Sequence, residues 1–363
     1  RPLNVLVGAN GSGKTSLLEV FSLLAASADG RLNAKLRDLG GFSSVVTQGQ
    51  TKPLEIGVDW RADDGETCRY EIARSVSGVG YRVHFEKLGK LKPDGALSGF
   101  AEFPSVGVTD PTELVLGGTQ PNQQESQLSQ VLVPATFAGV PRLERTWALI
   151  HAFRNALLSC SRYASPDVGL SSPIRLPQQL RPADLPGENG EDLIACLYGM
   201  REVAPDAYAS LEDSLRAAFP GFVRLEFPSV AAGMLAMLWR DERFAQPLYM
   251  NQLSEGTLRF LWLSALLHSP RLPKLVLIDE PEVSLHPELL RLLAELMRAA
   301  ADRSQLIVAT HSDRLVRFLD PGEVAAMDLD EEGMVTAQRA DELDLEEWLN
   351  EYSLDELWQM GRA

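Results

Sequence analysis

The clearest chemistry lies in a short segment near the start of the chain. Residues 8–15 read GANGSGKT and match the pattern GxxxxGK[ST]. Glycines at these positions let the backbone curl so that successive N–H groups point at phosphate oxygens, and a following helix adds its positive end. We predict a nucleotide-phosphate site in which Lys14 reaches the β- and γ-phosphates and the Thr15 hydroxyl binds Mg²⁺. The residues predicted to contact the nucleotide are Asn10, Gly11, Ser12, Gly13, Lys14, Thr15 and Ser16.

A second segment with chemistry, residues 275–280, lies far along the chain. It reads LVLIDE, an apolar run that ends in two carboxylates. A buried strand would deliver these acids at its carboxyl end, where the sheets of α/β proteins bind ligands. We predict that Asp279 holds Mg²⁺ through water and that Glu280 orients and deprotonates an attacking water. The alternative is a strand that simply ends in a solvated acidic turn.

Two further segments fit the same chemistry. Residues 252–257 read QLSEGT and stand just before the acidic segment. Ser254 and Gly256 at a helix N-terminus would make a second anion site, although ordinary helix capping is the simpler alternative. His311 ends the strand-like segment that follows the acidic one. Taken alone, His311 would be a satisfied polar residue at a strand end.

These residues need a parallel α/β framework to bring them together. Apolar runs and helical periodicity predict alternating strands and helices, which lie at residues 3–7, 14–27, 254–269, 274–280, 287–303 and 304–312. Residues 323–330 and 334–338 are candidate terminal strands. Because the strand–helix–strand rhythm occurs at both ends of the chain, we predict that the two ends share one sheet.

The middle of the chain has a different pattern. Alternating segments at residues 53–61, 67–76 and 80–88 predict an antiparallel sheet beside the main one. Residues 90–130 are rich in Gly, Pro, Ser and Gln and predict a loop. Helical and strand-like patterns follow; the predicted helices lie at about 141–163, 189–203 and 205–219, and a predicted strand lies at 233–240.

These patterns predict four parts of the chain. Residues 1–114 and 223–335 are the two halves of one α/β domain, and residues 115–222 form a mainly helical insert between them. Residues 336–363 form an acidic tail in which the apolar side chains of 345–359 have helical spacing. We expect this tail to pack as a helix on the domain; a docking surface for a partner is the alternative.

Composition bounds the class of protein. Of 363 residues, 45% are hydrophobic and 23% are charged, as in soluble globular proteins. No apolar run is long enough to span a membrane, and the first segment does not resemble a signal peptide. Three isolated cysteines, Cys68, Cys160 and Cys196, fit a reducing cytoplasm and no zinc site. Because the chain begins with Arg1 and not with Met, we expect natural residues to precede it.

Charge is unevenly spread. The formal net charge is −16, and most of it comes from residues 320–363. Residues 137–182 are instead basic and contain Arg142, Arg145, Arg154, Arg162, Arg175 and Arg181. A basic patch can bind a nucleic-acid backbone, so Arg142, Arg145 and Arg154 are candidate DNA contacts. The alternative is an ordinary solvated helix face.

Taken together, the motifs resemble those of the non-transporter ABC-type ATPases, the branch that contains RecF-like, SMC-like and OLD-like proteins and the bacterial "AAA family" ATPases. The spelling DEPEVSLHP at residues 279–287 is similar to the EPExxLHP form of this branch, and LSEGT at 253–257 is similar to its LSxGT. The resemblance covers about residues 1–90 and 225–335. It implies an α/β P-loop NTPase fold of the ABC ATPase type, with a mixed sheet, a flanking antiparallel β-subdomain and an inserted helical subdomain.

The resemblance also implies a mechanism. Two copies would dimerise on binding ATP and Mg²⁺, and Ser254 and Gly256 of one copy would contact the γ-phosphate held by the other. His311 would sense the γ-phosphate, and Lys14, Glu280 and His311 would be the catalytic residues. Gln48 or Gln50 would link Mg²⁺ to the insert. Residues after His311 are too few for the nuclease domain of OLD-like relatives, so any nuclease-like effector would be a separate protein.

Several functions fit these expectations. The first is a cytoplasmic ATPase that acts in DNA-linked or anti-phage defence processes with a separate effector. The alternatives are a RecF-like repair ATPase that binds duplex DNA directly, the ATPase subunit of a transporter, and a scaffold in which the nucleotide is only structural. The motif spellings speak against the transporter.

Overall fold

A computed structural model of the protein describes residues 1–46, 54–62, 65–77, 80–91, 97–104, 126–130, 141–330 and 333–342. The chain forms two compact units: Arg1–Leu18 with Ser161–Ala363, and Glu19–Cys160. These divisions differ from the predicted boundaries after residues 114 and 222. The chain returns to the first unit at Ser161 because a short strand there joins the main sheet.

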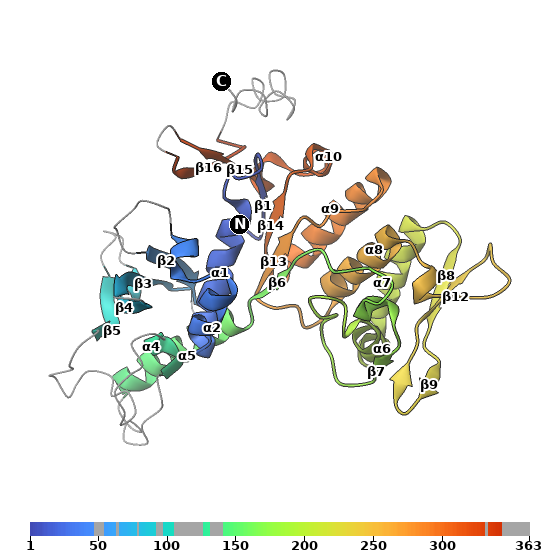
Figure 1. The fold of residues 1–363 in the computed structure, drawn as a ribbon, viewed down its shortest axis with the longest axis horizontal. Coiled ribbons are helices and arrows are strands. Elements are labelled where there is room, and N and C mark those ends of the chain that lie inside the picture. Colours follow the sequence, from blue (N-terminus) through green and yellow to red (C-terminus); the bar gives the residue numbers. More distant parts are fainter. Residues whose placement is uncertain are drawn as a thin grey trace. The chain divides into compact units, whose positions relative to one another are not determined.

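The first unit is built on a six-stranded sheet in the order β16-β15-β1-β14-β13-β6 (Figure 1). Its strands are β1 (Leu3–Val7), β6 (Ser161–Tyr163), β13 (Leu275–Asp279), β14 (Gln305–Thr310), β15 (Val324–Leu329) and β16 (Val335–Arg339). All ladders are parallel except that of β16 with β15. Strand β1 therefore lies between two strands from the other end of the chain, which confirms the predicted shared sheet and the α/β fold class.

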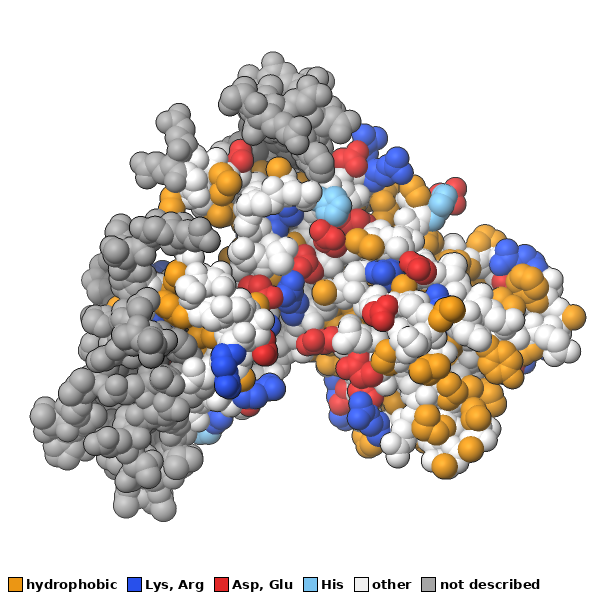
Figure 2. Space-filling view, in the orientation of Figure 1, with side chains coloured by type: hydrophobic (Ala, Val, Ile, Leu, Met, Phe, Trp, Pro, Cys, Tyr) orange, Lys and Arg blue, Asp and Glu red, His pale blue; other side chains and the backbone are white. Residues whose placement is uncertain are grey.

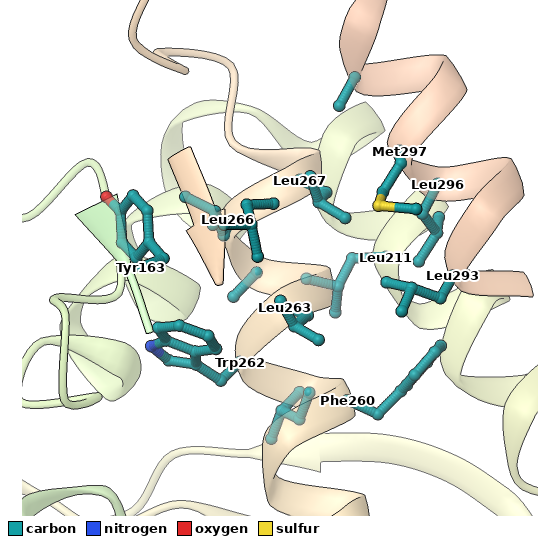
Figure 3. Packing of buried hydrophobic residues seen from close by; sticks show 14 of the residues in the cluster. Tyr163, Leu211, Phe260, Trp262, Leu263, Leu266, Leu267, Leu293, Leu296 and Met297 are labelled. Atoms are coloured by element: carbon teal, nitrogen blue, oxygen red, sulfur yellow. The ribbon is translucent and has the colours of Figure 1, made fainter. Parts of the chain in front are cut away.

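Apolar side chains of two helices cover this sheet and form the main core. Helix α8 (Glu255–His268) packs against α9 (Pro287–Ala301), and α9 packs against β1 and β14. In α9 the buried residues recur every three or four positions, as an amphipathic helix requires. Figure 3 shows Leu263 and Leu267 of α8 beside Leu293 and Met297 of α9. Burial of one such side chain stabilises the fold by about 1.5–3 kcal/mol.

The rest of the first unit consists of shorter elements, of which α6 and α7 pack against α8. They are α6 (Leu193–Val203), α7 (Pro205–Ala218), α10 (Asp313–Val316), β7 (Gln178–Gln179), β8 (Phe222–Glu226), β9 (Ser229–Ala231), β10 (Met234–Leu235), β11 (Leu238–Asp241), β12 (Leu248–Tyr249), and 3₁₀ turns at Pro173–Arg175, Met250–Gln252 and Pro321–Glu323. The strands make two small antiparallel sheets, β7-β10-β9 and β12-β11-β8. Exposed apolar side chains gather over this region (Figure 2), among them Leu170, Val230 and Tyr249.

The second unit contains an antiparallel sheet in the order β2-β3-β4-β5. Its elements are β2 (Leu54–Arg61), β3 (Thr67–Ser77), β4 (Gly80–Leu91), β5 (Leu97–Pro104), α2 (Leu32–Asp38), α3 (Phe42–Val45), α4 (Gln127–Gln130) and α5 (Pro141–Leu158), together with most of α1 (Lys14–Asp29). The predicted antiparallel pairing of these segments is thus confirmed. Its core includes Tyr70 and Phe153, whose ring centroids are 5.0 Å apart.

Some predicted elements were wrong. The helix predicted at 141–163 ends at Leu158, because Ser161–Tyr163 pairs with β13 instead. Residues 90–130 are not all loop, since β5 and α4 lie within them. The single strand predicted at 233–240 is two short strands in different sheets. The helix predicted from residue 189 begins at Leu193, after a turn in which Gly190 has a φ of 75°.

The glutamines predicted to link Mg²⁺ to the insert, Gln48 or Gln50, lie outside the described residues, and so does the predicted helix at 345–359. Among the helices that the structure describes, none is long and apolar enough to cross a membrane.

Candidate functional site

The segment at residues 8–15 joins β1 to α1 in the geometry that a phosphate-binding loop requires. Gly11 and Gly13 have φ values of 87° and 86°, which L side chains rarely adopt. A Cβ added to Gly8 would lie 2.2 Å from the carbonyl oxygen of Met327 in β15, so only glycine fits there. Asn10 and Gly11 are exposed, as are Thr15 and Ser16 in the first turn of α1. These groups are free of protein cover and available to an anion.

Lys14 lies folded into this loop. Its Nζ donates to the carbonyl oxygens of Gly8 at 2.7 Å and Ala9 at 2.8 Å, and it lies 3.4 Å from Ser12 Oγ. Burial lowers the pKa of the Lys14 ammonium, and the nearby carboxylates of Glu280 and Asp279 partly oppose that shift. The loop thus holds a buried cation opposite carboxylates from β13 and the turn after it.

Asp279 ends β13 with its two carboxylate oxygens in different surroundings. Oδ2 accepts a hydrogen bond from Arg162 Nη2 at 2.7 Å, whereas Oδ1 is buried and has no hydrogen-bond partner among the described residues. A buried carboxylate oxygen without a partner is costly unless a ligand binds it. Hard cations such as Mg²⁺ prefer oxygen ligands, so Asp279 together with the exposed hydroxyl of Thr15 fits Mg²⁺. Among the described residues no cluster of three or more His, Cys, Asp or Glu could hold a metal by itself.

Glu280 and His311 contact each other at the same edge of the sheet. His311 Nδ1 lies 3.0 Å from Glu280 Oε1, and the Glu280 N–H donates to the carbonyl oxygen of Ala309 at 2.8 Å. Glu280 has a φ of 50°, a left-handed conformation that costs a non-glycine residue about 1–2 kcal/mol. Backbone strain of this kind concentrates at functional sites. The carboxylate and the imidazole remain partly exposed, so both can reach a ligand.

Glu282 is a further carboxyl group of this site that the sequence analysis missed. Its Oε1 accepts hydrogen bonds from Thr310 Oγ1 at 2.5 Å and from the His311 N–H at 3.3 Å. Burial raises the pKa of Glu282 above its ordinary value. Glu282 therefore holds the end of β14 that carries His311. The signal was available in the sequence, as the second acid of the EPE spelling at residues 280–282.

Arg162 was also missed as a site residue, since its segment was predicted to be helical. In the structure it lies on β6, where it pairs with Leu277 of β13, two residues before Asp279. Side chains two positions apart on a strand share a face, which explains the contact between the Arg162 and Asp279 side chains. Only the strand pairing places this guanidinium beside the acidic segment.

Ser254 and Gly256 begin α8. Ser254 is the N-cap residue, and its Oγ accepts a hydrogen bond from the Thr257 N–H at 3.1 Å. A Cβ added to Gly256 would lie 2.5 Å from the carbonyl oxygen of Ser284, so Gly256 permits close packing against the turn after β13. Ser254 is exposed. Helix capping thus describes the local structure, and the exposed N-terminus of α8 is also open to a second molecule.

Four arginines of residues 137–182 have partners within the chain. Arg162 pairs with Asp279, Arg181 pairs with Asp192, and buried Arg175 donates to the carbonyl oxygens of Val168, Met250 and Leu253. In α5, Arg154 Nε donates to the Ala28 carbonyl oxygen at 2.9 Å. Positions 145 and 154 lie about 180° apart around an ideal helix. Arg142 and Arg145 stay predicted nucleic-acid contacts.

Comparison with known protein families finds one that matches most of the chain. The family described as "AAA domain, putative AbiEii toxin, Type IV TA system" matches the chain over residues 3–94 and 162–317. No protein of curated function matches the chain.

Solved structures of SMC heads are also similar. An SMC head bound to the C-winged helix domain of ScpA has 14% identity and a TM-score of 0.52, and the match covers 94% of this chain and 91% of that chain. The SMC head domain from Thermotoga maritima has 10% identity and a TM-score of 0.43, covering 93% and 89% of the two chains. The first likeness shows a shared fold.

Proposed function

Because the chain belongs to the AAA-domain family that it matches over residues 3–94 and 162–317, and is a P-loop ATPase of the ABC and SMC type, we propose that it binds ATP with Mg²⁺ and hydrolyses it to ADP and phosphate. One observation carries this proposal. Lys14, Asp279, Glu280 and His311, from segments far apart in the sequence, meet at the carboxyl edge of one sheet. Ligands of open α/β sheets bind at this edge.

Each group has a role in this reaction. The backbone N–H groups of residues 10–16 and the Lys14 ammonium would hold the phosphates. Thr15 and Asp279 would hold Mg²⁺, which when bound neutralises charge on the β- and γ-phosphate oxygens. Glu280 would accept the proton of the attacking water, and His311 Nδ1, which contacts Glu280, would hold that carboxylate in place.

The proposal is tested with two variants that fail at different steps. Lys14→Ala should lose ATP binding, because it removes the cation of the phosphate loop. Glu280→Gln should keep ATP binding and lower kcat about 100-fold or more, because an amide cannot take the proton. Equilibrium binding of ATP and phosphate release with Mg²⁺ measure the two effects. Glu288→Gln, at an exposed position on α9, is the matched control. ATP turnover that survives in Glu280→Gln would contradict the assigned role.

We further propose that ATP drives two copies together. Ser254 and Gly256 of one copy would close on the γ-phosphate held by the other, and loss of phosphate would release the pair. The exposed N-terminus of α8 supports this, because a helix N-terminus attracts anions. In this proposal the charge of the γ-phosphate switches the assembly.

The process that such a switch serves is proposed as DNA-linked or defence-related, with a separate effector protein. The family description names a toxin–antitoxin system, and the similar SMC head was solved with a protein partner, ScpA. The test compares the proteins and nucleic acids retained by Glu280→Gln with ATP and by Lys14→Ala. We expect retention by the first variant only, and salt-sensitive duplex retention that depends on Arg142 and Arg145 would indicate direct DNA binding.

A further inference from the structure

We propose that exposed apolar side chains of the β15–β16 hairpin, Leu329 and Val335, bind the base of the nucleoside triphosphate whose phosphates lie at residues 8–15. This inference rests on the proposed function and adds to it the site for the other end of the nucleotide.

The order of the strands sets the direction in which the nucleotide must lie. The phosphate loop follows β1, and the acidic residues Asp279 and Glu280 stand at the end of β13, two strands away across β14. The parallel strands end at the same edge, so Asp279 and Glu280 would meet a bound metal and γ-phosphate on the β13 side of the loop. The nucleoside end therefore extends to the opposite side of β1, where β15 and β16 lie.

The hairpin on that side touches the phosphate loop. A Cβ added to Gly13 would lie 2.7 Å from Val335 Cγ2, so the Val335 side chain packs directly beside this glycine. Leu329 of β15 is the ladder partner of Val335 in β16. Directly opposed residues of an antiparallel pair share a face, so Leu329 and Val335 form one apolar surface next to the loop.

This surface is open and suits the uncharged end of a nucleotide. Leu329 is 46% exposed and Val335 is 48% exposed, although both are apolar. The flat, uncharged face of a base loses contact with water when it covers apolar side chains, whereas a phosphate group loses hydration without gaining a partner there. The hairpin therefore fits the base and not the phosphates.

The experiment separates base binding from phosphate binding. The full chain and the double variant Leu329→Ser with Val335→Thr are titrated with ATP and with inorganic tripolyphosphate, both with Mg²⁺. The variant should bind ATP about five- to tenfold more weakly and tripolyphosphate as well as the wild type does, because only ATP has a base. Met334→Ser is the control, since Met334 is equally exposed and directly precedes Val335 but lies outside the ladder that pairs Val335 with Leu329.

The other outcomes overturn either this inference or the proposed function. Equal weakening of both ligands would mean that the double variant disturbs the loop, and it overturns the inference. An unchanged ATP affinity, or one changed as much by Met334→Ser, also overturns it. If the wild type binds neither ligand, the proposed function fails as well.

A second measurement does not depend on how the variants fold. Photolabelling of the wild type with 8-azido-ATP should place the label on the peptide that contains Leu329 and Val335. Labelling confined to the antiparallel sheet β2–β5 would overturn the inference.

Discussion

At the scale of single residues, the pair of Arg162 and Asp279 controls the acidic end of β13. The two side chains are 21% and 11% exposed, and the ion pair measures 2.7 Å. With Oδ2 held by the guanidinium, Asp279 presents Oδ1, which is buried and has no hydrogen-bond partner in the part of the chain that the structure describes. Arg162 therefore positions the carboxylate that would meet Mg²⁺.

A double-mutant cycle tests the coupling of this pair. Arg162→Met leaves a largely buried carboxylate unpaired, and we expect it to lower the free energy of unfolding by about 2–4 kcal/mol. The double variant Arg162→Met with Asp279→Asn should lose less free energy of unfolding than the two single variants lose together. We expect the difference, which is the coupling energy, to be about 1–3 kcal/mol. Urea unfolding measures the stability of each protein. Strict additivity of the two changes would contradict the pairing.

A second readout separates positioning from stability alone. Arg162→Lys retains a cation, and it should keep more Mn²⁺ affinity than Arg162→Met in titrations of the ATP-bound protein. Equal Mn²⁺ affinity in both variants and in the wild type would limit Arg162 to a structural role.

The site was predictable from sequence where its chemistry is local. Lys14, Asp279, Glu280 and His311 each stand in or next to a recognisable segment, because loop and strand-end geometry require those residue types in that order. Arg162 was not predictable, because its role depends on which strand lies beside β13. Glu282 required knowing that Thr310 ends the neighbouring strand. The roles of Gln48 and Ser254 stay predictions.

At the scale of elements, the contact between α7 and α8 contains a half-buried histidine. His268 in the last turn of α8 directs Nε2 at Ser214 Oγ of α7, 3.2 Å away, and Nδ1 at the Ser264 carbonyl oxygen, 2.9 Å away. Burial lowers the pKa of His268, the cation of Arg303 adds to this, and the hydrogen bond to Ser264 opposes it. The folded protein therefore favours the neutral imidazole.

This contact predicts an acid-sensitive stability. Because the folded pKa of His268 is below the unfolded value of about 6.5, its contribution is complete above that pH and is lost as pH falls through the folded pKa. His268→Gln keeps a neutral hydrogen-bonding group. We expect it to remove part of the stability loss below about pH 6.5. Urea unfolding across pH measures this loss.

The control for this prediction is His286→Gln. His286 is 69% exposed at the start of α9, so its replacement should leave the pH profile unchanged. If the wild type and His268→Gln lost the same stability below about pH 6.5, His268 would not be the cause of the acid sensitivity.

The elements themselves were predictable where they are long or carry a clear period. Strand β13 and helix α9 agree with their predicted positions within two residues at each end. Strand β6 has three residues, too few for a period, and its structure is decided by pairing with β13. Strands β10 and β11 appeared as one segment because the break at Ala236 and Met237 has no Gly or Pro. Tertiary pairing decided these cases.

At the scale of the whole molecule, the chain ends share one sheet, and this was predictable from the matching rhythms at both ends. The second copy stays a prediction from the motifs, since the contacts of Ser254 within its own chain are those of a helix cap. In the proposed dimer, Lys14 would act on the nucleotide of its own copy, and Ser254 on the nucleotide of the other.

Mixing two inactive variants tests that division. Lys14→Ala removes the phosphate-loop cation, and Ser254→Asp keeps an N-cap residue while opposing the γ-phosphate with negative charge. Each variant alone should be inactive. In a mixed dimer one site has both defects, and the other pairs an intact phosphate loop with an intact Ser254. A 1:1 mixture should therefore regain about a quarter of the wild-type ATPase rate, since about half of the dimers are mixed and each has one working site of two. If Ser254 acted on its own copy, mixing would restore nothing, and the ATP-driven dimer would have to be abandoned.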